Sequence, residues 1–163
     1  MYELIYEKFP HYSPIADILT IIICILLILL LSQTFVTRDN RYRLFQTMLM
    51  MVTAAGFLNL SFHGLFVLNL GIPVIVIHAL RLLAHVCLFV IPFLYVLYIC
   101  DFLQIEKAEA KKFIWIAGVI YVGVILLDLF GSIFGFGFMI YSDGTYKLWL
   151  DGNSVKVGLL AAA

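Results

Sequence analysis

Apolar residues fill four long runs of this chain, and short groups of polar and charged residues separate them. The runs extend over 15–36, 44–68, 74–102 and 113–134. Each is long enough to cross roughly 30 Å of hydrocarbon as a helix. Because lipid offers the backbone no hydrogen-bond partners, we expect α-helices over all four runs. The pattern predicts an all-α membrane protein, with a four-helix transmembrane domain over residues 1–134.

The chain changes character after the fourth run. Two short stretches rich in aromatic residues flank the pair Asp143-Gly144, which favours a hairpin turn. We therefore expect a short aromatic, β-hairpin-like tail over 135–154. Residues 155–163 turn apolar again, which predicts the start of a further transmembrane helix.

Composition and charge place the chain in a membrane and orient it. Hydrophobic residues make up 64% of the sequence and charged residues 12%, which excludes an ordinary soluble domain. The net charge of zero gives no basic surface for nucleic acid. Basic residues concentrate in the first and third connections, at Arg38, Arg41, Arg43, Lys107, Lys111 and Lys112. The positive-inside rule then predicts a multi-pass protein of the cell membrane whose N-terminus and tail are extracytoplasmic.

A few polar residues interrupt the apolar runs at similar depths. In the third run, the spacing of His78, Arg81 and His85 places these side chains on one face of a helix. Ionisable groups at membrane depth normally face a protein interior or a watery cavity. We therefore predict a polar layer in the outer half of the membrane, formed by Asp17, Asn59, His63, His78, Arg81, His85 and Asp128. Within it, Arg81 is expected to pair with Asp128 or Asp17.

The polar layer has more than one interpretation. A buried arginine that is paired and hydrogen-bonded can simply fix how the helices pack. A cation and imidazoles facing outward would instead suit a small extracytoplasmic anion or carboxylate. A transport or channel subunit is a further alternative, although the run of apolar residues beyond His85 argues against conduction by one chain. A small protein resembling a b-type cytochrome is another, with histidines as axial haem ligands.

Metal binding and catalysis have little support in the sequence. His78 and His85 are two helical turns apart, roughly 10 Å, which is too far to share one metal ion. The chain contains no Gly-rich phosphate loop, GxSxG elbow or HExxH helix. Its three cysteines lie within apolar runs and show no CxxC spacing. We expect no metal, no cofactor and no enzymatic activity, and a homo-oligomer remains compatible with the pattern.

Several short motifs carry a resemblance to a known group of proteins. They are Tyr12-Ser13-Pro14-Ile15-Ala16-Asp17-Ile18, the turn Arg38–Arg43, Asn59 with His63, the face around Arg81, and Phe136-Gly137-Phe138-Met139-Ile140-Tyr141-Ser142-Asp143-Gly144. Together they resemble the N-terminal multi-helix membrane region of bacterial GGDEF/EAL-type signalling proteins, or the input region of some sensor histidine kinases.

The resemblance implies a sensory or anchoring module of a bacterial signal-transduction protein. Its helices would lead to a cytoplasmic output domain that makes or degrades cyclic di-GMP, or would act on a separate partner protein. These 163 residues include no output domain, so the resemblance assigns no catalytic residue to them.

Overall fold

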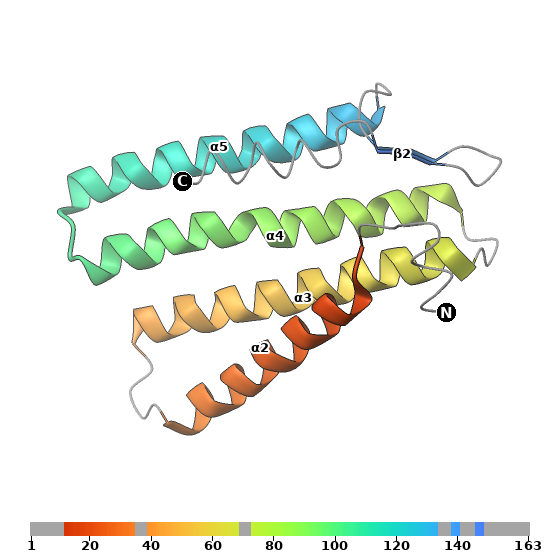
Figure 1. Cartoon of the computed structure of the whole chain (residues 1–163). Helices are drawn as coiled ribbons and strands as arrows, with labels where there is room; N and C mark the ends of the chain where they lie inside the picture. Colours follow the sequence, from red (N-terminus) through yellow and green to blue (C-terminus); the bar gives the residue numbers. More distant parts are fainter. Residues whose placement is uncertain (1–11, 35–38, 69–72, 134–137, 141–145, 149–163) are drawn as a thin grey trace. The chain divides into compact units, whose positions relative to one another are not determined.

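The computed structural model describes residues 12–34, 39–68, 73–133, 138–140 and 146–148. These residues form four helices and two short strands, which are labelled in Figure 1. They are α2 (Pro14–Thr34), α3 (Asn40–Leu68), α4 (Val74–Phe102), α5 (Lys107–Ile133), β1 (Phe138–Ile140) and β2 (Tyr146–Leu148). The chain divides into two compact units, Met1–Leu88 and Phe89–Ala163, and the division falls inside α4.

All four described helices are long and apolar enough to cross a membrane, which confirms this part of the sequence prediction. The predicted bounds match α4 and differ at the other three helices, by one residue at the start of α2 and by more at the starts of α3 and α5. α3 begins at Asn40, earlier than predicted, because Asp39 caps it: its Oδ1 accepts a hydrogen bond of 2.8 Å from the backbone N–H of Tyr42. α5 begins at Lys107, because Glu106 accepts the first backbone bond, from Ala110, at 2.9 Å.

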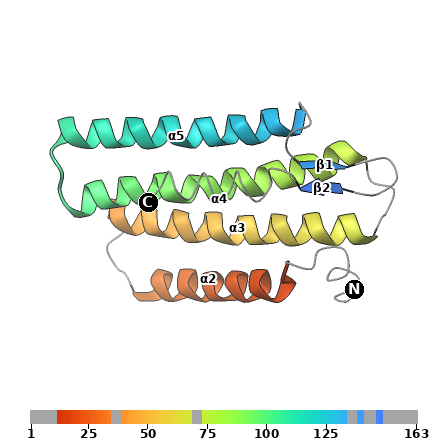
Figure 2. The same ribbon diagram turned by 45° about the horizontal axis from the view of Figure 1, so that its top comes forward.

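In the first unit, α2 packs against α3 (Figure 2). Ile21 and Cys24 are buried on α2, and Ala55 and Gly56 are buried on α3. A Cβ atom added at Gly56 would lie only 3.0 Å from Cγ1 of Ile21. The absence of a side chain at Gly56 therefore allows the two backbones to approach closely, as small residues do between membrane helices.

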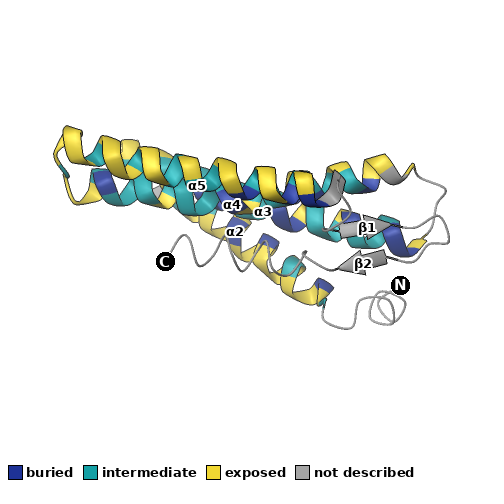
Figure 3. Ribbon diagram, turned by 90° about the horizontal axis from the view of Figure 1, so that it is seen from above, coloured by how far each residue is buried: buried dark blue, intermediate teal, exposed yellow. Residues whose placement is uncertain are grey.

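Most of α2 is exposed, as Figure 3 shows. Large apolar side chains such as Leu19, Leu26 and Leu30 are 52%, 54% and 58% exposed. Exposed apolar side chains along a whole helix are expected where lipid is the solvent. The residues of α4 in this unit show a clear face, with Ile77, Arg81 and Ala84 buried.

In the second unit, the end of α4 is closed by a Schellman motif, in which Gln104 adopts the left-handed conformation with φ of 52°. The backbone N–H of Ile105 donates to the carbonyl of Cys100 at 3.1 Å, and that of Gln104 donates to Asp101 at 3.3 Å. These bonds satisfy two carbonyls that the helix end would leave without partners. α5 follows after a very short connection.

The two strands of the second unit pair antiparallel, with Phe138 opposite Leu148, Met139 opposite Lys147 and Ile140 opposite Tyr146. The turn predicted at Asp143-Gly144 and the further helix predicted over 155–163 lie outside the described residues. The extracytoplasmic placement of the tail stays a prediction.

Candidate functional site

Four polar side chains meet where the start of α2 faces the second half of α3. Asn59 Nδ2 donates a hydrogen bond of 2.8 Å to Asp17 Oδ2. The hydroxyl of Tyr12, just before α2, donates to the same oxygen at 2.7 Å. His63 completes the group through its contacts with Tyr12 and Asn59. We call Tyr12, Asp17, Asn59 and His63 the polar cluster; one carboxylate oxygen in it links the segment before α2, α2 itself and α3.

The His63 imidazole is held by one hydrogen bond and two aromatic rings. Its Nδ1 lies 2.8 Å from the backbone carbonyl of Asn59. A carbonyl only accepts, so Nδ1 carries the proton, and in the neutral ring the lone pair is on Nε2. The Tyr12 ring stacks on the imidazole, with centroids 3.5 Å apart and planes inclined by 6°. Phe62 contacts it edge-on at 4.8 Å.

The Tyr12 phenol is a neutral hydrogen-bond donor. Burial raises the pKa of this phenol above its ordinary value, and the hydrogen bond and negative charge of Asp17 raise it further. Tyr12 precedes the apolar span that begins at Pro14. The Tyr12 hydroxyl therefore keeps its proton throughout the physiological range. It donates a hydrogen bond to an acceptor, here Asp17.

Local sequence explains how the polar cluster forms. Asp17 lies in the first turn of α2, where the positive end of the helix dipole favours a carboxylate. Asn59 and His63 are four residues apart and so share one face of α3. Gly56, one turn earlier on α3, removes the side chain that would keep α2 away. Each feature is local, and only helix packing brings them together.

The predicted residues on α4 and α5 show two degrees of burial. Arg81 and Asp128 are each 4% exposed, whereas His78 and His85 are half-buried. Among the described residues, no buried side-chain nitrogen or oxygen lacks a hydrogen-bond partner. A buried charge with its partners in place is typical of a group that fixes helix packing. The pairing of Arg81 with Asp128 stays a prediction.

The structure brings together three of the predicted site residues: Asp17, Asn59 and His63. Within the described residues, the hydrogen bonds to the Asp17 carboxylate come from Tyr12 and Asn59. In the same part of the chain, no group of three or more His, Cys, Asp or Glu side chains could hold a metal ion.

Sequence reasoning did not identify Tyr12 as a member of the site. Its side chain lies outside the helical periodicity that marked the other residues. The available signal was an aromatic hydroxyl five residues before the carboxylate at the start of an apolar run, a distance that a short extended segment can span.

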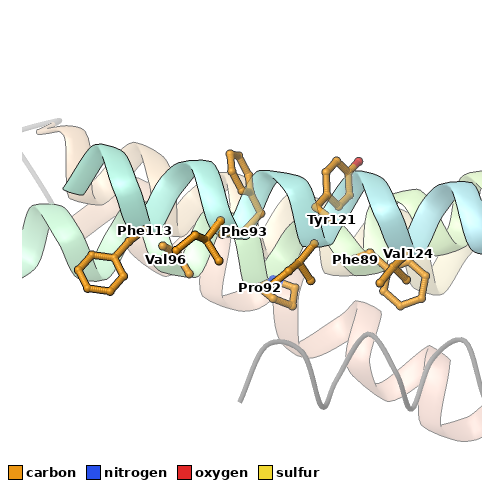
Figure 4. A pocket seen from close by; sticks show the side chains of 10 residues that line it. Phe89, Pro92, Phe93, Val96, Phe113, Tyr121 and Val124 are labelled. Carbon is orange, nitrogen blue, oxygen red and sulfur yellow. The ribbon is translucent and has the colours of Figure 1, made fainter. Parts of the chain in front are cut away.

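A cavity of about 180 Å³ lies in the second unit, between the end of α4 and α5 (Figure 4). Its walls are apolar apart from the phenol of Tyr121, whose ring centroid lies 6.1 Å from that of Phe93. Phe89 and Val124 are buried at one end of the cavity. At the other end Phe113 is 52% exposed. The cavity was not predicted, because it depends on how side chains of two helices fill space.

Comparison of the chain with protein-family models, with curated proteins and with solved structures gave no match. We therefore infer a function from the polar cluster, the buried charges and the length and apolar character of the helices.

Proposed function

We propose that this chain is the membrane-embedded sensory or anchoring module of a bacterial signal-transduction protein, acting through a cytoplasmic output domain or a separate partner protein. One observation supports this most directly: Asp17 Oδ2 accepts hydrogen bonds from both Tyr12 and Asn59. A single acceptor thus connects the segment before α2, α2 itself and α3. The four apolar helices are consistent with a multi-pass membrane protein.

The polar cluster suits sensing because its hydrogen bonds depend on one another. If Asp17 binds another donor, Tyr12 and Asn59 lose their shared acceptor, and the stack of Tyr12 on His63 loses its support. Polar networks of this kind have few alternative arrangements, so a local change becomes a change in helix packing. The α2–α3 contact at Gly56 and Ile21 would transmit it.

The chemistry of Asp17 limits what the module would sense. A carboxylate accepts hydrogen bonds, so a competitor must donate them. A proton or a small ligand with an ammonium group fits this requirement better than the anion expected from the sequence. Arg81, the group that suggested an anion, is 4% exposed and contributes to packing in this proposal.

In this proposal the polar cluster lies on the extracytoplasmic side, as the positive-inside rule predicts, and an external ligand acts on it there. Labelling of single cysteines tests this orientation. A cysteine at Arg43, which is exposed at the start of α3, should react only with reagents that enter the cytoplasm. Reaction with an impermeant external reagent in intact cells would place the polar cluster at the wrong face and defeat the sensing proposal.

Spin labels on α2 and α3 test the sensing step itself. Both labels go on exposed residues, Ser32 and Arg43, after Cys24, Cys87 and Cys100 are replaced by alanine. We expect the distance distribution to change with pH or with small ammonium compounds, and to stop responding in Asp17→Asn. Tyr95→Phe, which changes an exposed tyrosine on α4, is the control and should respond like the parent. An invariant distribution in the parent protein would overturn the proposal.

The output half of the proposal has a separate test in the coding DNA downstream of Ala163. An open frame into a nucleotide-cyclase, phosphodiesterase or kinase domain supports it. A stop codon with no neighbouring signalling gene counts against it.

A further inference from the structure

The cavity in the second unit has the chemistry and shape of a site for an alkyl chain. Its lining is almost wholly apolar, with Phe89, Phe93, Ala117 and Ile120 contributed by both helices (Figure 4). An engineered apolar cavity of about 150 Å³ stays dry and takes up benzene, so a volume of about 180 Å³ has room for a hydrocarbon segment of similar bulk. An empty cavity of this size destabilises a fold, which favours occupancy by whatever apolar molecule is available.

The cavity runs along α5 for the depth of one leaflet. Its lining residues on α5 extend from Phe113 to Val124, about 16 Å at the rise of an α-helix. Half of the hydrocarbon thickness of a bilayer is about 15 Å. The exposed end is at Phe113 and Ile116, and the buried end is at Val124. An acyl chain that entered at Phe113 would therefore end near the middle of the membrane.

Charge at the exposed end fits a phospholipid headgroup. Lys112 is exposed and lies at the Phe113 end of α5. Lys112 is also one helical turn before Ile116, on the same side of α5. Glu109 lies nearby as well, one turn before Phe113, so the local charge is mixed. The ammonium groups of lysine are established donors to phosphate oxygens, and lysine side chains at the ends of membrane helices extend toward the membrane–water interface.

From these features, we propose that the second unit binds one membrane phospholipid, with part of an acyl chain in the cavity and its phosphate at Lys112. The site is independent of the polar cluster and of the sensing proposal, because it uses only residues of the second unit. It differs from the general lipid surface in that part of the chain lies between two helices.

Native mass spectrometry of the full chain, released from nanodiscs of phosphatidylethanolamine and phosphatidylglycerol, tests the proposal. We expect one retained phospholipid per chain. Ala117→Phe places a ring in the cavity and should lower retention by about tenfold. Lys112→Gln should lower it less. Leu127→Phe, on an exposed part of α5 outside the cavity, is the matched control and should retain the lipid.

Photocrosslinking with a phosphatidylglycerol that carries a diazirine in its acyl chain locates the lipid without any variant. Labelling of Phe93, Ala117 or Ile120 supports the site even if Ala117→Phe fails to fold, which its helical circular dichroism would reveal. Three results would each overturn the proposal. They are the absence of a retained lipid in the parent protein, equal lipid retention in folded Ala117→Phe, and labelling confined to exposed residues such as Leu127.

Discussion

The aromatic ring of Tyr12 lies parallel to the imidazole of His63, with ring centroids 3.5 Å apart. Its hydroxyl donates to Asp17 at 2.7 Å. Tyr12 thus contacts both α2 and α3 from a position outside either helix. Separate substitutions can remove the hydrogen bond and the stack.

Tyr12→Phe removes the hydrogen bond and keeps the ring. We expect a loss of about 1.5–3 kcal/mol in the free energy of unfolding, as for a hydrogen bond to a charged group. Tyr12→Ala should cost more, because the stack on His63 is lost as well. Thermal unfolding in detergent measures both effects. Tyr95→Phe removes the hydroxyl of a tyrosine that is 55% exposed, and this control should leave the midpoint unchanged.

Alkaline pH should act on the same phenol. Since the folded-state pKa of Tyr12 is raised, its contribution to stability is fully present below about pH 10, where the unfolded chain also keeps the proton. Above that pH the unfolded state loses the proton first, so stability falls, by up to about 1.4 kcal/mol per pH unit. Unfolding measured at increasing pH should show this slope in the parent. A parallel decline in Tyr12→Phe would show that other groups cause it.

Gly56 and Gly64 provide a matched pair for testing the α2–α3 contact. A Cβ atom at Gly56 would lie 3.0 Å from Ile21, whereas one at Gly64 would meet nothing within 4 Å. Gly64→Ala should raise stability by about 0.5–1 kcal/mol through helix propensity. Gly56→Ala should be less stable than Gly64→Ala by about 1–3 kcal/mol, the usual effect of overpacking. Equal effects would mean that the helices are not in close contact here.

The predicted pairing of Arg81 with Asp128 can be tested by exchanging the charges. Both side chains are 4% exposed, and removal of one partner of a buried ion pair costs about 3–5 kcal/mol. Arg81→Asp and Asp128→Arg should each impair folding, and the double exchange should recover much of the loss. Yield of folded protein and thermal midpoint measure the recovery. If the double variant is as unstable as the single ones, the two residues do not form a pair.

Gln104 closes α4 in a conformation that favours glycine. With φ of 52°, its Cβ adds strain that a glycine at this position would not have. Gln104→Gly should therefore raise stability, by up to about 1 kcal/mol, and Gln104→Val should lower it. Thermal unfolding separates the two directions. A fall in stability with glycine would show that the Gln104 side chain makes a contact that outweighs the strain.

Much of the fold follows from the sequence, because a run of apolar residues long enough to cross a bilayer has few structures open to it. The bounds were less predictable. Asp39 and Glu106 set the starts of α3 and α5, and such capping residues lie outside the apolar pattern. The Schellman motif at Gln104 could not be predicted either, since its glutamine gives no glycine signal.

The polar cluster was partly predictable. Helical spacing placed Asn59 and His63 on one face of a helix. The cost of a carboxylate in lipid indicated that Asp17 belongs to the same polar layer, and Asn59 binds it there. Tyr12 depends on the path of two residues before Pro14, which no periodicity describes. The cavity depends on the volumes of side chains from both α4 and α5, so a residue pattern along one helix cannot reveal it.

The uneven burial of α2 has an evolutionary consequence. Over residues 14–33, the part of α2 whose burial the structure describes, Pro14, Ile21 and Cys24 are buried, and residues 25–33 include no buried residue. The first half of α2 should accept few replacements, since each must fit against α3. The second half should accept almost any sufficiently apolar residue. Natural variants of this protein should therefore differ in sequence along residues 25–33 while these residues stay hydrophobic.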